Sequence, residues 1–228
     1  MRSWAELLPP LDSPLMHIPD GFLSPQTYLP AYAVAVGGWV WAARGIRQRL
    51  DETTVPRLAM LTALAYGLGL VMLPIPGGTS GHMLSVALLA LIFGIRLTFL
   101  AYSLVLLLQA LLFGAGGITA WPVNALAIGL VGAASAVGVR TLLARIDATA
   151  AVAIAAWFSV VLSGLTIALV LGIQPWIAHQ TDGTPLFYPF GLAITVPAIL
   201  IPHCIIGIGE AALTVLIWRY AKSRHWCA

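Results

Sequence analysis

The chain has 228 residues, of which 60% are hydrophobic and only 8% are charged, and its formal net charge is +3. A soluble globular domain carries about 25% charged residues, so this composition excludes an ordinary soluble fold. Because a bilayer span needs about 20 apolar residues, the chain has room for roughly six or seven spans with short loops in one membrane domain.

The first residues of the chain, 1–15, do not have the pattern of a signal peptide. They lack a continuous apolar core and contain both prolines and acidic side chains. A short strip that begins with Met16 and His17 follows, and it precedes the first apolar segment.

Seven apolar segments come next, and each is expected to be a helix. They cover residues 28–43, 57–73, 83–94, 97–113, 123–143, 149–172 and 190–218. The third is short for a full span, so we expect it to be tilted or packed inside the bundle. The seventh holds Pro197 and Pro202, and a proline kinks a helix because it lacks a backbone donor. The sequence therefore predicts an all-α integral membrane fold with about seven transmembrane helices.

The basic residues predict how these segments cross the membrane. Apart from Arg2, every Lys and Arg falls on one side of a seven-span arrangement, which the positive-inside rule places in the cytoplasm. The strip at Met16 and the loops 74–82, 114–122 and 172–189 then lie outside, and the C-terminus is cytoplasmic. These basic residues are Arg44, Arg47, Arg49, Arg57, Arg96, Arg140, Arg145, Arg219, Lys222 and Arg224.

Composition also narrows the chemistry of any site. No basic run with interleaved aromatic residues is present, which argues against a nucleic-acid partner. The two cysteines, Cys204 and Cys227, are too few and too badly placed for a disulfide framework or a thiolate metal site. Imidazole, which borderline divalent transition metals favour, is the remaining candidate ligand.

Met16 and His17 form a candidate chelating pair. If Met16 is the first residue, its α-amine, the amide nitrogen of His17 and the His17 imidazole can close two fused chelate rings in nearly one plane. Square-planar nitrogen coordination suits Ni²⁺ or Cu²⁺. His82 ends a glycine-rich outer loop whose backbone can fold tightly, so it can supply the fourth nitrogen.

Four stretches resemble the signatures of the CbiM/NikM family, the substrate-capture components of energy-coupling-factor transporters for cobalt and nickel. In chain order they are MHIPDGFLSP (16–25), PIPGGTSGHML (74–84), QALLFGAGGITAWPVNALAIGLVG (109–132) and HCIIGIGEAALT (203–214). The resemblance implies a seven-helix membrane fold and a metal bound by the N-terminal amine, the amide and imidazole of the second residue, and a loop histidine. In this chain those ligands are Met16, His17 and His82.

The family pattern begins at the methionine, whereas this sequence begins earlier. A peptide bond before Met16 would remove the basic amine and spoil the chelate. We therefore expect residues 1–15 to be a mis-assigned or non-native extension and residues 16–228 to form the membrane domain. The alternatives are processing before Met16 and a protein with an altered site.

Several polar residues are candidates for support of the metal. Asp20 can anchor the strip by accepting backbone hydrogen bonds, or it can belong to a local Pro-Asp-Gly turn. Asn124 and Gln109 lie in apolar surroundings, where they either join helices or support a metal-binding histidine. His203 and Glu210 are seven residues apart and share one helix face, so they are a possible functional polar pair or a packing clamp.

The function expected from these features is a membrane component that captures Ni²⁺ or Co²⁺ for import, with the metal as transported substrate and no resident cofactor. The chain has no P-loop, so energy must come from partners, which the resemblance implies are ATPase subunits, a transmembrane coupling subunit and sometimes a small accessory membrane protein. A stand-alone secondary transporter or channel is the alternative. No HExxH motif is present, and an enzyme is not expected.

Overall fold

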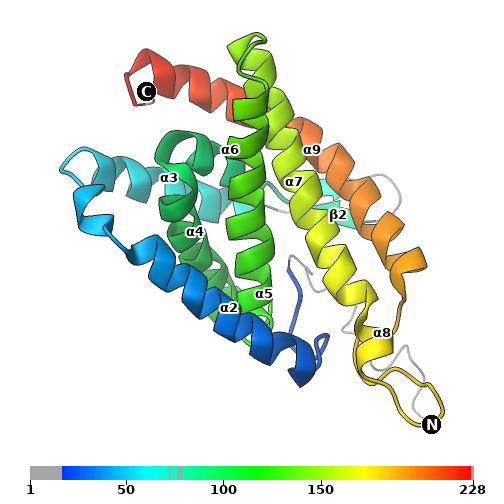
Figure 1. The fold of residues 1–228 in the computed structure, drawn as a ribbon. Coiled ribbons are helices and arrows are strands. Elements are labelled where there is room, and N and C mark those ends of the chain that lie inside the picture. The colour runs from blue at the N-terminus through cyan, green and yellow to red at the C-terminus, as the bar shows by residue number, and fades with distance from the viewer. Residues whose placement is uncertain (1–16, 72, 76–78, 227–228) are drawn as a thin grey trace.

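The computed structural model describes residues 17–71, 73–75 and 79–226, and it is a bundle of helices (Figure 1). Met16 and the extension 1–15 lie outside the described residues. The elements are α2 (Pro25–Ala43), η1 (Ile46–Gln48), α3 (Thr54–Gly69), β1 (Leu73–Ile75), β2 (Thr79–Gly81), α4 (Val86–Phe113), α5 (Trp121–Asn124), η2 (Ala125–Gly132), α6 (Ala133–Leu142), α7 (Ala148–Gly172), α8 (Gln174–Ile177) and α9 (Leu192–Ser223).

Within the described residues, four helical stretches are long and apolar enough to cross a membrane. They are Val86–Phe113, Trp121–Leu142, Ala148–Ile177 and Leu192–Ser223. Large apolar side chains are exposed along the outside of the bundle, for example Val34 on α2 and Ile201 and Ile208 on α9. Such a surface is stable in lipid but not in water. The expected membrane protein is confirmed, whereas the count of seven spans stays a prediction.

Helix α4 consists of two arms that meet at Gly94. This residue has φ 79° and ψ 171°, which are not helical angles and which only glycine adopts readily. The arms on either side of Gly94 correspond to the third and fourth segments expected from the sequence. Just after the corner, the Arg96 guanidinium lies 4.7 Å from the centre of the Trp41 ring and donates to the carbonyl of Arg44 at 3.4 Å. The corner therefore lies beside the connection between α2 and α3.

The fifth expected segment is a single stack of three helical pieces, α5, η2 and α6. Its middle piece, η2, is a π-helix, a form that often occurs at functional sites. At its end the carbonyl of Gly132 accepts hydrogen bonds from Ser135 and, at 2.8 Å, from Ser159 of α7. The π-helix begins directly after Asn124, so the irregularity adjoins one of the candidate support residues.

Helices α7 and α9 lie side by side along much of their length (Figure 1). Glycines at their interface allow this close approach, because a Cβ at Gly207 of α9 would lie 2.8 Å from the ring of Trp157. The Trp157 indole also donates to the carbonyl of Cys204 at 3.1 Å. Helix α9 is a single helix that contains both Pro197 and Pro202.

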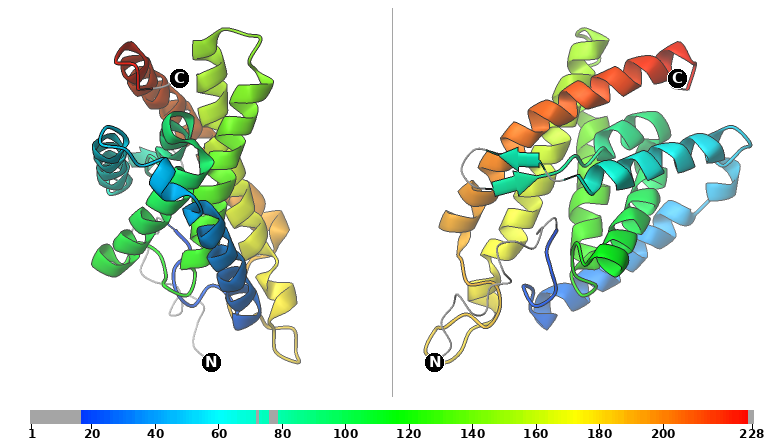
Figure 2. Two further views of the ribbon diagram at one scale, coloured as in Figure 1. Left: turned by 60° about the vertical axis from the view of Figure 1, so that its left-hand side comes forward. Right: turned by 180° about the vertical axis from the view of Figure 1, so that it is seen from behind.

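The segment before His82 is a short antiparallel hairpin, whereas the sequence predicted a loop in an all-α chain. Strands β1 and β2 pair with Leu73 opposite Gly81 and Ile75 opposite Thr79. Seen from behind, the hairpin lies next to α9 (Figure 2), which β2 contacts. The hairpin ends at Gly81, and the next residue, His82, is buried in the interior of the bundle.

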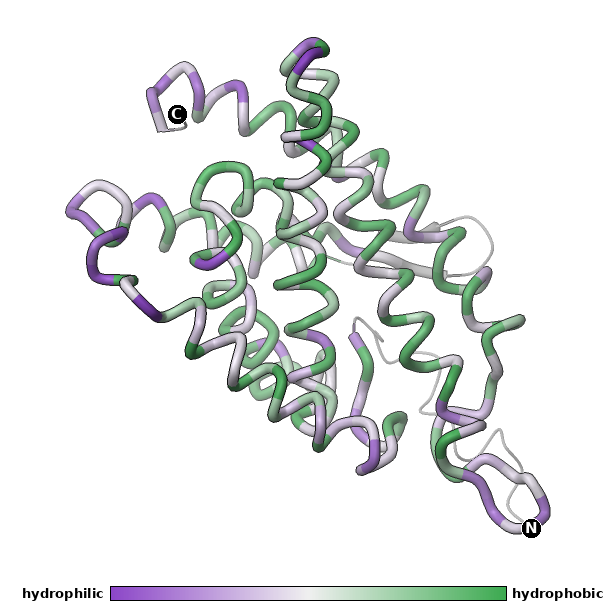
Figure 3. The backbone as a smooth tube through the Cα atoms, in the orientation of Figure 1, coloured by the Kyte–Doolittle hydropathy of each residue, from purple (hydrophilic) through white to green (hydrophobic). Residues whose placement is uncertain are grey.

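The connections between helices gather at two ends of the bundle. In Figure 1 the α2–α3 connection lies at the left, and the α6–α7 connection and the last turns of α9 lie at the top. The residues after His17, the α4–α5 connection and the α7–α9 connection lie in the lower half. Hydrophilic residues concentrate at these ends, and hydrophobic residues cover the helices between them (Figure 3). This distribution is what a bilayer-spanning bundle requires.

Candidate metal centre

The residues before α2, 17–24, form an N-terminal strip that is inserted into the bundle and turns at Asp20 and Gly21. Ile18 exchanges two hydrogen bonds with the Asn124 side chain, at 3.2 Å from its amide and at 3.1 Å to its carbonyl. The same carbonyl accepts from the amide of Gly117 at 2.9 Å. The Asn124 side chain thus pairs with the Ile18 backbone as a neighbouring strand would. This pairing positions His17, the residue before Ile18.

Asp20 fastens the middle of the strip to the α4–α5 connection. Its carboxylate accepts from the amides of Ile118 at 3.1 Å and Thr119 at 2.8 Å, and from the Thr119 hydroxyl. Partial burial alone would raise the pKa of Asp20, but these hydrogen bonds outweigh it and lower the pKa. Asp20 therefore carries a charge at neutral pH that binds two segments about a hundred residues apart in sequence.

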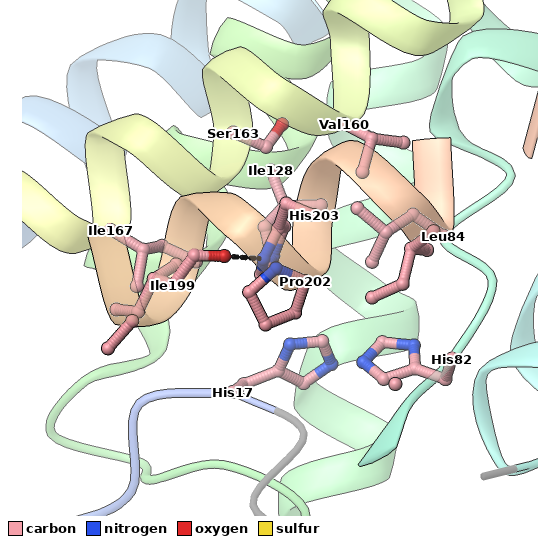
Figure 4. A pocket seen from close by; sticks show the side chains of 13 residues that line it. His17, His82, Leu84, Ile128, Val160, Ser163, Ile167, Ile199, Pro202 and His203 are labelled. Atoms are coloured by element: carbon pink, nitrogen blue, oxygen red, sulfur yellow. Dashed lines mark hydrogen bonds between the residues drawn. The ribbon is translucent and has the colours of Figure 1, made fainter. Parts of the chain in front are cut away.

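His17 and His82 come together inside the bundle from distant parts of the chain. Their ring centroids are 5.1 Å apart and the ring planes are nearly perpendicular, at 87°. The two residues are 6% and 7% exposed, respectively. Figure 4 shows the two rings facing each other, His17 from the strip and His82 from the end of the hairpin.

The two ring nitrogens of His17 have different surroundings. Nε2 lies 3.1 Å from the amide oxygen of Gln109, which can only accept, so Nε2 carries the hydrogen. Nδ1 is buried and has no hydrogen-bond partner among the described residues. Burial is the main cause and the nearby His82 the second cause of a lowered pKa of His17, which is about 3. The imidazole is therefore neutral, and the lone pair of Nδ1 is available to a ligand.

Both histidines line a cavity of about 190 Å³. Most of the lining side chains are apolar and come from η2, α7 and α9, including Ile128, Val160 and Ile167. His203 of α9 also lines it and lies on the far side from the other two imidazoles (Figure 4). Three imidazoles therefore face one small space among mostly apolar side chains.

His203 and Glu210 do not share a partner, although they lie on one helix. His203 Nδ1 bonds the carbonyl of Ile199 at 2.7 Å. Glu210 is fully buried and accepts from the amides of Leu84 at 3.0 Å and Ser85 at 2.5 Å. The carboxylate thus caps the start of α4, directly after the segment that carries His82.

Two supporting features escaped the analysis of the sequence. Gln174 is fully buried and its amide oxygen accepts from the amide of Ser24 at 3.0 Å, which holds the end of the strip on α8. A Cβ at Gly117 would collide with the backbone of Asp20, and one at Gly116 would lie 3.1 Å from the Cβ of His17. A lone glutamine near an apolar segment was a usable signal, as it was for Gln109, whereas the glycine contacts depend on the folded path of the strip.

The donors present on described side chains are too few to complete a metal site. No group of three or more His, Cys, Asp or Glu residues within the described part of the chain is arranged to hold a metal ion. A cation bound by His17 and His82 would therefore need further ligands that the described side chains do not supply. The Nδ1 atom of His17 can close a chelate ring with the amide of its own residue through Cα, Cβ and Cγ, and this is the nitrogen that the structure leaves open.

Comparisons with known proteins give a consistent result. A family model described as the cobalt uptake substrate-specific transmembrane region matches residues 17–226. The chain is 35% identical over 215 residues to the probable fused nickel transport protein LarMN of Lactiplantibacillus plantarum, covering 91% of this chain and 64% of that protein. It is 34% identical over 206 residues to the fused nickel transport protein NikMN of Rhodobacter capsulatus, covering 87% of this chain and 59% of that protein.

The chain thus spans about three fifths of the length of these two fused relatives. It covers more of the cobalt transport protein CbiM of Clostridium cellulovorans, with 30% identity over 207 residues, 90% of this chain and 78% of that protein. The crystal structure of a truncated transition metal transporter matches with a TM-score of 0.86 at 34% identity, covering 92% of this chain and all of that one.

Proposed function

The chain belongs to the CbiM family of cobalt-uptake transmembrane proteins, a membrane component of nickel or cobalt transport, and on that premise we propose that it captures Ni²⁺ or Co²⁺ for an energy-coupling-factor importer. The observation that carries the proposal is the pair of buried, facing imidazoles of His17 and His82, together with the buried Nδ1 atom of His17, which has no hydrogen-bond partner among the described residues. A buried polar atom without a partner is costly, and a metal ion removes that cost.

The proposed coordination uses four nitrogen atoms. The α-amine of Met16, the amide and Nδ1 of His17 and one ring nitrogen of His82 would surround the cation in a plane, which suits Ni²⁺. The proposal requires a free amine at Met16 in the mature protein. Asp20, Asn124 and Gln109 position the strip and the His17 ring and do not themselves reach the metal.

We further propose that seven segments cross the membrane, with the strip outside and the C-terminus in the cytoplasm. The two arms of α4 are two of these segments, and the corner at Gly94 then lies on the cytoplasmic side beside Arg44 and Arg96. The clustering of the basic connections at one end of the bundle supports this orientation.

The energy for import is proposed to come from ATPase subunits that act through a transmembrane coupling subunit, with or without a small accessory membrane protein. The chain has no P-loop of its own. A stand-alone secondary transporter is less well supported, because His203 and Glu210 bond to different partners and do not form a charged pair at the bilayer midplane.

Metal analysis of purified protein whose N-terminus is verified as Met16 tests the capture site. His17→Ala and His82→Ala should each abolish tight, near-stoichiometric Ni²⁺ and Co²⁺ binding and leave at most weak residual binding, because each removes one of the two imidazoles of the proposed coordination. His225→Ala is the matched control, since His225 is exposed near the C-terminus. Tight binding that survives both of the first two changes would place the metal elsewhere.

The role of the partners is tested by uptake. Membrane vesicles that contain this chain without ATPase subunits should bind nickel but not concentrate it, because nothing couples binding to work. Accumulation of the metal in such vesicles would favour the stand-alone transporter.

A further inference from the structure

The cavity behind the capture site contains a third imidazole that the proposed coordination does not use. His203 projects from α9 into the space that His17 and His82 also line (Figure 4). Apart from these three rings and Ser163, the side chains around this space are hydrocarbon or carry no polar group, among them Leu84, Ile128 and Val160. The Ser163 hydroxyl donates to the carbonyl of Ser159 at 2.7 Å.

The hydrogen bonding of His203 leaves a nitrogen available for a metal. Its Nδ1 lies 2.7 Å from the carbonyl oxygen of Ile199, and because a carbonyl can only accept, Nδ1 carries the hydrogen. Nε2 is then the atom with the lone pair, on the ring of a residue that lines the cavity. Metal-binding histidines usually have this arrangement, in which one ring nitrogen donates to a backbone carbonyl and the other binds the ion.

Close packing fixes the place of the ring. A Cβ at Gly164 of α7 would lie 2.6 Å from Cδ2 and 2.7 Å from Cγ of His203. The glycine therefore makes room for the imidazole at the interface of α7 and α9, and the hydrogen bond to Ile199 sets its rotation. A ring that is held on two sides is a pre-arranged donor.

A cation that leaves the proposed capture site through this cavity meets side chains that, apart from the imidazoles and Ser163, offer it no ligand. Moving an ion without ligands into apolar surroundings is very costly. Among the described side chains that line the cavity, His203 is the one imidazole outside the proposed coordination. A stepwise exchange of one nitrogen donor for another avoids a bare ion.

We propose that His203 is a second, transient ligand for the transported cation, which binds through Nε2 when the ion separates from His82. The inference rests on the proposed function, because it assumes that Ni²⁺ or Co²⁺ first binds at His17 and His82. The exchange replaces one neutral nitrogen donor by another, so no electron moves and no proton is released. His203 and the capture site are not occupied together as one static cluster, in keeping with the lack of a three-residue metal group among the described residues.

A cycle of variants measured with Ni²⁺ alone tests the proposal in purified protein that begins at Met16. In the wild-type background, His203→Ala should change the dissociation constant by no more than about twofold, because His82 still holds the ion. In the His82→Ala background, adding His203→Ala should weaken the residual binding by a further factor of about ten or more, because the substitute donor is gone.

The two backgrounds separate a ligand from a merely structural residue. A structural defect would weaken binding equally with and without His82, and equal effects or no effect in both backgrounds overturns the proposal. Absence of tight binding by the wild-type protein would instead overturn the proposed function.

A second variant keeps the imidazole but displaces it. In the His82→Ala background, Gly164→Ala should weaken the residual Ni²⁺ binding as His203→Ala does, because the new methyl group takes the space of the His203 ring. In the wild-type background it should have little effect. Gly138→Ala is the matched control, since a Cβ there meets nothing within 4 Å. A Gly164→Ala protein that binds residual Ni²⁺ as well as the control would contradict the assignment.

Discussion

The chemistry of His17 depends on which of its two ring nitrogens is occupied. The side-chain oxygen of Gln109 accepts a hydrogen bond from Nε2 of His17. The side-chain nitrogen of Gln109 donates to the carbonyl of Tyr66 at 3.5 Å, and this second bond orients the Gln109 amide. This arrangement keeps Nδ1 as the unprotonated nitrogen. In the proposed site, a residue that does not touch the metal would thus decide whether the chelate can form.

Replacement of Gln109 is expected to weaken metal capture without abolishing the fold. Gln109→Leu keeps the size of the side chain but removes the acceptor for Nε2, so the ring loses its fixed orientation, and Ni²⁺ affinity should fall by about 10–100-fold. Gln48→Leu, at an exposed position, is the matched control. Equal affinity of the two variants in a calorimetric titration would show that Gln109 only joins helices.

At the level of residues, the sequence indicated the pairing of His17 with His82 because both occur in short, chemically distinctive stretches on one predicted side. It did not indicate which nitrogen is open, since that depends on the rotation of Gln109. The contribution of Gln174 was also missed, because its partner Ser24 is 150 positions away in the chain. Contacts of that range follow from helix packing and have no local signature.

The elements that carry the site are held to one another at the start of α4. Glu210 of α9 accepts from the amides of Leu84 and Ser85, and a Cβ at the preceding Gly209 would lie 2.8 Å from the methyl group of Met83. The three residues after His82 are therefore attached to α9, the helix that also bears His203. The carboxylate also meets the positive end of the helix dipole of α4.

Loss of this cap should affect stability and metal binding together. Glu210→Ala leaves two buried amides without a partner, at a cost of about 1–3 kcal/mol each, and it frees the segment that holds His82. Glu210→Gln keeps one acceptor and should be affected less. Thermal unfolding in detergent, together with Ni²⁺ titration, measures both effects.

The control for this cap is Glu52→Ala, which removes an exposed carboxylate. If Glu210→Ala lowers the melting temperature but leaves Ni²⁺ affinity equal to that of the control, the cap does not position His82.

Most elements were predictable from apolar runs, including the two arms of α4, because a run interrupted near Gly94 and followed by an arginine indicates a turn at the membrane surface. The hairpin β1–β2 was missed because each strand has only three residues, too few for an alternating pattern. The π-helix η2 was missed as well, since its composition is that of any apolar helix.

For the whole molecule, the strip and the basic connections lie at opposite ends of the bundle. In the proposed orientation, the capture site opens toward the outer side of the membrane, and His203 and Glu210 follow along α9 toward the cytoplasmic side. An importer needs such an order of sites, because the cation must be collected outside and released inside.

The orientation can be tested with cysteines placed at exposed positions in each connection. In a background with Cys204→Ser and Cys227→Ser, Asp182→Cys of the α7–α9 connection should react with a membrane-impermeant maleimide in intact cells. Ala144→Cys of the α6–α7 connection should react only after the cells are opened. The reverse pattern would invert the proposed topology.

The inserted strip has a consequence for how the protein matures. Residues 17–24 leave the ribosome before every segment they will touch, and Ser24 cannot meet Gln174 until another 150 residues have been made. The proposed capture site is therefore completed only after most of the chain has been made, when the helices that hold the strip are present.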